Sequence, residues 1–203
     1  VLISYYDSTN TNLKVAHCSD AECTDATITT IDSTAVVGLY TSLVLGADGL
    51  GLISYFDSTN DNLKVAHCSD VVCSQATLTP LDTEGVVGRH SSITIGADGL
   101  GLVSYFDSTE GDLKVAHRAN VLCTAATLST IDTEGVVGRY TSIATGSDGL
   151  GLISYHGTSN DDLRVAHCVD VLCTAATISI LESVGIVGEH TSLTIGSDGL
   201  GLI

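Results

Sequence analysis

The sequence predicts an all-β fold: a β-propeller whose four-stranded antiparallel blades come from a repeat of 50 residues. The first observation is the repeat, because the text of residues 91–123 recurs along the 203-residue chain without insertion or deletion. The second is four short apolar segments per repeat, each bounded by Gly, Asp, Asn or Ser. Four strands in roughly 40–50 residues are typical of a propeller blade. Another β-repeat array or a filament is the alternative.

Within each repeat, the first apolar segment is predicted as a strand that leads into an Asp-Gly hairpin turn. Asp-Gly tolerates the positive φ that such turns require, and the pair begins at Asp48, Asp98, Asp148 and Asp198. A second strand follows, then a polar loop whose Asp and Asn side chains can hydrogen-bond their own backbone. The first strand of the repeat is expected at residues 41–45, 91–95, 141–145 and 191–195, and the second at 2–6, 52–56, 102–106 and 152–156. The third is expected at 13–18, 63–68, 113–118 and 163–168, and the fourth at 26–31, 76–81, 126–131 and 176–181.

The chain is expected to be one repeat domain over residues 1–203 that forms part of a longer array or associates with itself. Both ends fall within the same strand of the repeat, so residues 202–203 would compete with residues 2–3 for one place in a closed four-bladed ring. A larger ring, a ring shared by two chains or a polymer is therefore favoured. The predicted units are a partial blade at 1–38, whole blades at 39–88, 89–138 and 139–188, and a partial blade at 189–203.

Acidic residues dominate the charge of the chain, with 24 Asp and Glu against 7 Lys and Arg and a net charge of −17. Such a surface repels phosphate, which argues against nucleic acid as a partner, and it disfavours anionic membranes. The sequence has no apolar run of about 18 residues, so we expect no insertion into a membrane. The composition suits a soluble extracellular protein or a cation-binding one.

Cysteines recur in pairs with four residues between them, at the connection of the third and fourth strands. A pair that closes so short a loop suits a disulfide and implies an oxidising compartment, hence an extracellular or cell-surface location. Metal ligation with the adjacent His17, His67 or His167 is the alternative, although zinc takes four ligands. Arg118 replaces the first Cys of the third pair, which leaves Cys123 as an unpaired thiol. The predicted disulfides are Cys18–Cys23, Cys68–Cys73 and Cys168–Cys173.

Histidine recurs at two positions of the repeat. In the third strand we expect a packed side chain that hydrogen-bonds a neighbouring blade, with a ligand or pH-sensing role as the alternative; this position holds His17, His67, His117 and His167. The other position, just before the first strand, alternates between Tyr and His and could line a ligand groove or form a polar rim. It holds Tyr40, His90, Tyr140 and His190.

Carboxylates open the polar loop between the second and third strands at Asp7, Asp57 and Asp107. Oxygen-rich loops of this kind can hold Ca²⁺, so these three residues are weak calcium candidates. EF-hand spacing is missing, and Gly157 takes the place of the Asp in the last repeat. A turn in which the Asp side chain binds its own backbone is the competing interpretation, and no other cofactor is expected.

The strings ISYYDSTNTNLKVAHCSDAEC (residues 3–23) and ISYFDSTNDNLKVAHCSDVVC (residues 53–73) resemble repeats of bacterial secreted and surface-anchored propeller-like arrays. The resemblance covers all four repeats and implies a propeller, but it implies little about activity. The blade pattern is also distantly similar to sialidase-type and lectin propellers. The Asp box of sialidases requires a Trp, which this chain lacks, and no Arg recurs in every repeat.

The sequence predicts a protein that is not an enzyme. No Gly-x-Ser-x-Gly elbow or triad spacing is present, and near-identical blades offer the same groups at every position. We expect a structural or adhesive extracellular repeat scaffold that can assemble with itself, in which many equal contacts give avidity. The alternative is a lectin-like propeller with glycan sites between blades. Expected partners are copies of itself and a glycan or other surface ligand.

Overall fold

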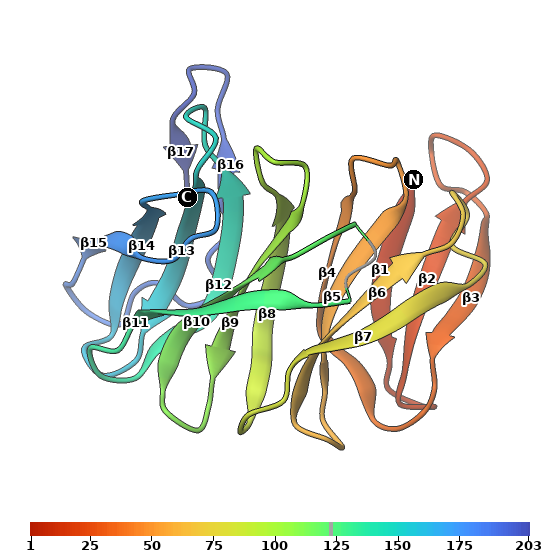
Figure 1. Cartoon of the computed structure of the whole chain (residues 1–203), viewed down its shortest axis with the longest axis horizontal. Helices are drawn as coiled ribbons and strands as arrows, with labels where there is room; N and C mark the ends of the chain where they lie inside the picture. Colours follow the sequence, from red (N-terminus) through yellow and green to blue (C-terminus); the bar gives the residue numbers. More distant parts are fainter. Residues whose placement is uncertain (122–123) are drawn as a thin grey trace.

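The computed structural model describes residues 1–121 and 124–203 and confirms the predicted all-β fold of four-stranded antiparallel sheets (Figure 1). Three sheets have four strands each, in the orders β4-β5-β6-β7, β11-β10-β9-β8 and β12-β13-β14-β15. A three-stranded sheet, β1-β2-β3, precedes them, and a two-stranded pair, β16-β17, follows. Among the described residues, no helix is long and apolar enough to cross a membrane.

The strands follow one plan in every repeat. Their bounds are β1 Leu2–Asp7, β2 Asn12–Cys18, β3 Ala26–Asp32, β4 Val37–Leu45, β5 Gly51–Asp57, β6 Asn62–Cys68, β7 Ala76–Asp82, β8 Val87–Ile95, β9 Gly101–Asp107, β10 Asp112–Arg118, β11 Ala126–Asp132, β12 Val137–Thr145, β13 Gly151–Gly157, β14 Asp162–Cys168, β15 Ala176–Glu182, β16 Thr194–Ile195 and β17 Gly201–Leu202. The first strands of neighbouring blades, β4, β8 and β12, pack beside one another, and we call them the inner strands (Figure 1).

The inner strands begin four residues earlier than predicted, because each contains an irregularity that strand patterning does not reveal. In β4, Val37 pairs with Asp57 and Leu39 with Phe56, but the next paired residue is Ser42, opposite Ser54. The skipped residues form a β-bulge, which bends the strand and redirects side chains. The same shift occurs in β8 and β12.

The apolar core lies between neighbouring sheets, as the architecture of stacked blades requires. One cluster joins Leu52 and Val65 of one blade to Ile93, Val103 and Tyr105 of the next. All of these side chains are buried. The second strand of each complete blade is therefore covered on both faces, which explains its continuous apolar character.

A polar group of three residues crosses each junction between the four large sheets, and we call it the inter-blade triad. At one junction, Asp82 at the end of β7 accepts hydrogen bonds from Tyr105 at 2.7 Å and from Lys114 at 2.7 Å in the next blade. The equivalent groups are Asp32 with Tyr55 and Lys64, and Asp132 with Tyr155 and Arg164. The second-strand tyrosines Tyr55, Tyr105 and Tyr155 are buried in the core.

The three predicted cysteine pairs form disulfides, Cys18–Cys23, Cys68–Cys73 and Cys168–Cys173. Each closes the connection between the third and fourth strands of a blade. Cys123, the predicted unpaired thiol, lies outside the described residues. Because disulfides persist in oxidising compartments, the three bonds indicate an oxidising environment.

The third-strand histidines correct a prediction, because their partner lies in their own blade and not in a neighbour. His67 Nε2 is 2.8 Å from Oδ2 of Asp48, the aspartate of the hairpin turn in the same sheet. His117 pairs with Asp98 at the same distance, as does His167 with Asp148. The hairpin folds its turn back toward the third strand, so residues 19 positions apart meet within one blade. The histidines are thus occupied in fixing these turns.

Candidate functional site

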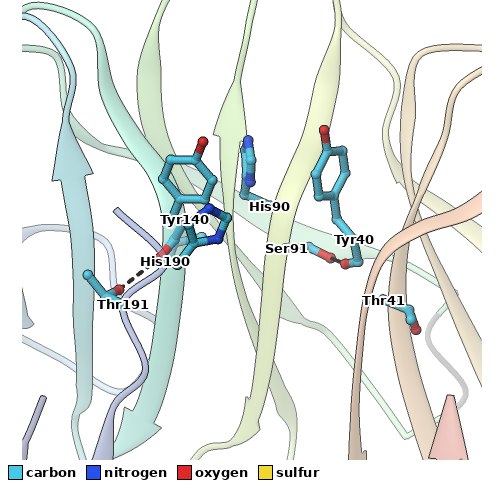
Figure 2. Close-up of a pocket in the computed structure, with 8 residues that line it drawn as sticks. Tyr40, Thr41, His90, Ser91, Tyr140, His190 and Thr191 are labelled. Atoms are coloured by element: carbon cyan, nitrogen blue, oxygen red, sulfur yellow. Dashed lines mark hydrogen bonds between the residues drawn. The ribbon is translucent and has the colours of Figure 1, made fainter. Parts of the chain in front are cut away.

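A pocket of about 240 Å³ opens where the inner strands meet, and two consecutive positions of the repeat line it (Figure 2). One is the Tyr/His position for which the sequence left a ligand groove open as a hypothesis. The next residue along the chain, always Ser or Thr, is the other. The lining residues are Tyr40, Thr41, His90, Ser91, Tyr140, Thr141, His190 and Thr191.

The β-bulge explains why two successive residues face the same pocket, although neighbours in a regular strand point to opposite faces. Tyr40, His90, Tyr140 and His190 have φ between 53° and 55°, in the left-handed region that side chains with a Cβ rarely adopt. Such a conformation costs on the order of 1–3 kcal/mol and persists where the surroundings impose it, often at functional sites. The polar loop and the second cysteine of the repeat recur in the same conformation, so what distinguishes this position is that its four side chains meet in one pocket.

The four rings of this position form a row, which we call the aromatic ladder (Figure 2). Ring centroids are 4.4 Å apart for Tyr40 and His90, 4.5 Å for His90 and Tyr140, and 4.2 Å for Tyr140 and His190. These distances are at or just below the short end of the range for interacting aromatic pairs, and the rings are tilted or edge-on and not parallel. The ladder offers a ligand both ring faces and polar ring atoms.

The Ser and Thr hydroxyls hold the base of the ladder. Ser91 Oγ donates to the backbone carbonyl of Tyr40 at 2.9 Å, and Thr191 Oγ1 donates to that of Tyr140 at the same distance. Ser91 also lies 3.0 Å from Ser54 Oγ of the preceding blade. Each bond joins consecutive blades, so the spacing of the rings is fixed by the packing of the blades.

His90 is neutral at physiological pH. Burial, followed by electrostatic interactions with Arg139, His190 and Arg89, lowers the pKa of His90 to about 4. A neutral imidazole has one nitrogen that donates a hydrogen bond and one that accepts. His90, at the centre of the ladder, can therefore either donate a hydrogen bond to a ligand hydroxyl group or accept one from it.

A second row of rings lies behind the ladder, on the second strands. Ring centroids are separated by 6.3 Å between Tyr40 and Phe56 and by 6.4 Å between His90 and Phe106. The guanidinium carbons of Arg89 and Arg139 lie 5.3 Å from the centroids of Phe56 and Phe106 respectively, within cation–π range. Positive charge is thus placed beside the aromatic ladder.

The calcium candidates lie at the loops between the second and third strands, and their oxygens are engaged within those loops. Asp57 Oδ1 accepts from the amides of Thr59 and Asn60, and Oδ2 accepts from Asn60 Nδ2 at 3.0 Å. Asp7 makes the same turn and also pairs with Lys14 at 2.7 Å. Asp107 binds the amides of Thr109 and Glu110. The competing interpretation, a side-chain-stabilised turn, matches this geometry.

Sequence reasoning found the ladder position but missed its companions. Tyr40, His90, Tyr140 and His190 recur at one repeat position, which drew attention to them, and the structure brings all four into one pocket. The adjacent Ser or Thr recurs equally well, but short hydroxyl residues are common throughout this chain. Arg89 and Arg139 were set aside because Arg does not recur in every blade, although they share one repeat position.

Comparison of the chain with protein-family models gives no match, and no curated protein is significantly similar in sequence. Solved structures do resemble it: its four-stranded antiparallel sheets match the blades of GH43 glycosidases, which are five-bladed β-propellers. A GH43 β-1,3-galactosidase superposes with a TM-score of 0.63 at 9% identity, over 97% of this chain and 47% of that one. The chain therefore spans less than half the length of that protein.

Two α-L-arabinofuranosidases have the same fold. The enzyme from Lactobacillus brevis has a TM-score of 0.59 at 12% identity, over 98% of this chain and 76% of that one. The enzyme from Clostridium thermocellum has a TM-score of 0.53 at 13% identity, over 96% of this chain and 78% of that one. At such low identity the likeness concerns the fold alone.

Proposed function

We propose that this protein is a non-enzymatic extracellular or cell-surface adhesive propeller that binds carbohydrate in the pocket of the aromatic ladder. The observation that carries the proposal is the convergence of four left-handed Tyr and His residues, one from each of four successive repeats, on one pocket. The propeller fold that the chain shares with GH43 carbohydrate-active enzymes is consistent with a sugar ligand.

The chemistry of the pocket suits a sugar. Aromatic rings pack against the C–H face of a pyranose, while hydroxyl and imidazole groups pair with its O–H groups. A concave site with apolar rings and a few placed polar groups is the usual form of a small-molecule site. The ladder also places Tyr140 between His90 and His190, so each sugar unit would meet a ring and a hydrogen-bonding partner.

The lining supports binding without hydrolysis. Glycosidases commonly use two carboxyl groups, about 5–10 Å apart, on either side of the scissile bond. The eight residues that line this pocket are Tyr, His, Ser and Thr, and none carries a carboxylate. A glycan bound here would meet no carboxyl pair.

The test compares His90→Ala with His167→Ala, which removes the same side chain from an exposed turn pair outside the pocket. A glycan array identifies ligands of the unmodified protein, and calorimetry then measures their affinity. We expect His90→Ala to weaken binding at least tenfold and His167→Ala to leave it unchanged. Equal affinities in both variants, or no ligand on a diverse array, would overturn the proposal. Release of reducing sugar would overturn its non-enzymatic part.

A second candidate function is self-association, which one observation favours. Tyr5 and Lys14 occupy, in the first sheet, the repeat positions of Tyr55 and Lys64, and Glu182 ends β15 at the position of Asp132. The outer sheets thus carry the two halves of an inter-blade triad. Apolar side chains accompany them, with Ile3 46% and Ile186 73% exposed. A second copy of the chain could join the halves.

Charge reversal tests this association. Light scattering should show a mass that rises with protein concentration for the unmodified chain. Glu182→Lys should give a monomer because it would face Lys14 of the other copy, and adding Lys14→Glu should restore the association. A monomer at every concentration of the unmodified chain would contradict the idea.

A further inference from the structure

Four of the seven Lys and Arg residues are neutralised by carboxylates within the structure. Lys14 pairs with Asp7, Lys64 with Asp32 and Lys114 with Asp82, at 2.5–2.7 Å. Arg164 pairs with Asp132 at 3.1 Å and with Asp162 at 2.9 Å. A fifth, Arg118, donates to the backbone carbonyl of Val121. The remaining two cations, Arg89 and Arg139, make no ion pair with any described residue.

Both arginines lie near the aromatic ladder, close enough for their charges to act on His90. Each directly precedes a ladder residue, His90 or Tyr140, in the chain. The guanidinium carbon of each lies 5.3 Å from the centroid of a second-strand ring, and that ring is in turn 6.3–6.4 Å from a ladder ring, so the two positive charges lie near the ladder on two adjacent blades. Both side chains are only partly buried.

Both guanidinium charges act on His90, yet neither arginine is paired with a carboxylate among the described residues of this strongly acidic chain. The cation–π contact with a phenyl ring restrains each guanidinium, and its N–H groups make no hydrogen bond to the described residues, so they can bind a planar anion. Arginine presents parallel N–H donors that match a carboxylate with two hydrogen bonds. The arrangement is thus complementary to a carboxylate.

The residue that precedes the ladder residue is not Arg in the other two repeats, so the charge beside the ladder changes from one end to the other. Leu39 precedes Tyr40, and Glu189 precedes His190. Positive charge therefore lies beside the middle of the ladder, and Glu189 places a negative charge near its far end. Negative charge at this end of the ladder disfavours a ligand that carries several anionic groups along its length.

We propose that the pocket selects a saccharide with a single carboxylate, such as a uronic acid unit, which Arg89 and Arg139 bind while the aromatic ladder packs against the sugar ring. This inference rests on the proposed function, because it names the class of sugar for the same pocket. The arginines supply selectivity, and the ladder supplies a surface that neutral sugars also contact. The negative field of the rest of the protein repels anions from other parts of the surface.

Calorimetry with glucuronic and galacturonic acids against glucose and galactose tests the proposal. We expect the acids to bind at least tenfold more tightly, with an advantage that shrinks as salt increases. Arg89→Gln and Arg139→Gln should each remove most of that advantage while leaving the affinity for the neutral sugars nearly unchanged. Lys14→Gln removes the same charge from the first sheet, outside the pocket, and should change neither affinity.

The outcomes separate this inference from the proposed function. Equal affinity for acids and neutral sugars, unaffected by the Arg variants, would overturn the carboxylate selectivity and leave carbohydrate binding intact. Binding of no sugar would overturn both. Equal binding of a sulfated sugar would show recognition of anions in general and contradict selection of a carboxylate. Arg89→Lys keeps the charge but loses the paired N–H donors, so it should retain only part of the preference for acids. Circular dichroism of each variant confirms that it is folded.

Discussion

The phenol of Tyr105 donates a hydrogen bond of 2.7 Å to Asp82 across the boundary between two blades. Lys114 reaches the same carboxylate oxygen, so the buried charge of Asp82 is paired as well as hydrogen-bonded. Burial first and the neighbouring Asp82 second raise the pKa of Tyr105 far above its usual range, so the phenol remains a donor at any physiological pH. The triad fixes the register of one blade on the next, and with it the spacing of the aromatic ladder.

Removal of this phenol should weaken the junction. We predict that Tyr105→Phe lowers the free energy of unfolding by about 1–3 kcal/mol, because a buried carboxylate loses one of its donors without loss of ring packing. Urea denaturation measures the change. Tyr5→Phe is the matched control, because Tyr5 occupies the same repeat position in the first sheet, and its phenol makes no hydrogen bond to an Asp within residues 1–121 and 124–203. Equal losses in the two variants would contradict a role for the triad.

The acid stability of the protein should depend on the same carboxylate. Burial alone would raise the pKa of Asp82, but hydrogen bonds from Lys114 and Tyr105 outweigh it, and the pKa lies below the ordinary value. A folded pKa below the unfolded value of about 3.9 means that the ionised triad stabilises the fold above that pH, and that this contribution is lost as the pH falls through the folded pKa.

We therefore expect the urea midpoint to be steady from pH 7 to about pH 5 and to fall below about pH 4. Asp82→Asn, which cannot ionise, should be less stable at pH 7 and should lose less stability on acidification. The midpoints of both proteins at each pH provide the comparison. Identical pH profiles would show that Asp82 does not contribute to acid sensitivity.

Much of the fold could be predicted from the sequence, because strand positions depend on local patterns that the repeat shows four times. The bulge at Tyr40 could not, since an Ala-Val-Val-Gly-Leu-Tyr segment carries no mark of a left-handed Tyr. The partner of His67 was placed in the wrong blade, because its identity depends on how far the hairpin turn folds back. Tyr105 and Asp82 are 23 residues apart in different repeats, so their contact depends on how blades pack.

Close approach of the chain to a neighbouring strand explains one recurring glycine. Gly88 has a φ of +101°, and a Cβ at this position would lie 2.6 Å from Cα of Leu63 in the preceding blade. Gly185 has a similar φ of +87°, but a Cβ there would meet no atom within 4 Å. Substituting Ala for each of these two glycines therefore separates the free-energy cost of the left-handed backbone from that of a steric clash.

We predict that Gly185→Ala costs about 1–2 kcal/mol through its left-handed conformation alone. Gly88→Ala should cost about 1–3 kcal/mol more, because backbone atoms must move to admit the methyl group. Thermal unfolding of both variants gives the comparison. A loss at Gly88 no larger than that at Gly185 would mean that the blades can separate freely at this point.

The disulfides should stabilise individual blades, and the third repeat shows that a blade can form without one, since Arg118 replaces its first cysteine. Cys68 and Cys73 are five residues apart, so their bond constrains only a short loop of the unfolded chain. For a loop of this length the chain-entropy model gives about 2 kcal/mol. We predict a loss of this size for Cys68→Ser combined with Cys73→Ser, measured by urea denaturation without reductant. Mass spectrometry of the unmodified protein should show a mass two hydrogens lower for each of the three bonds. A fully reduced mass would refute the pairing, and an unchanged midpoint in the double variant would show that the bond adds no stability to its blade.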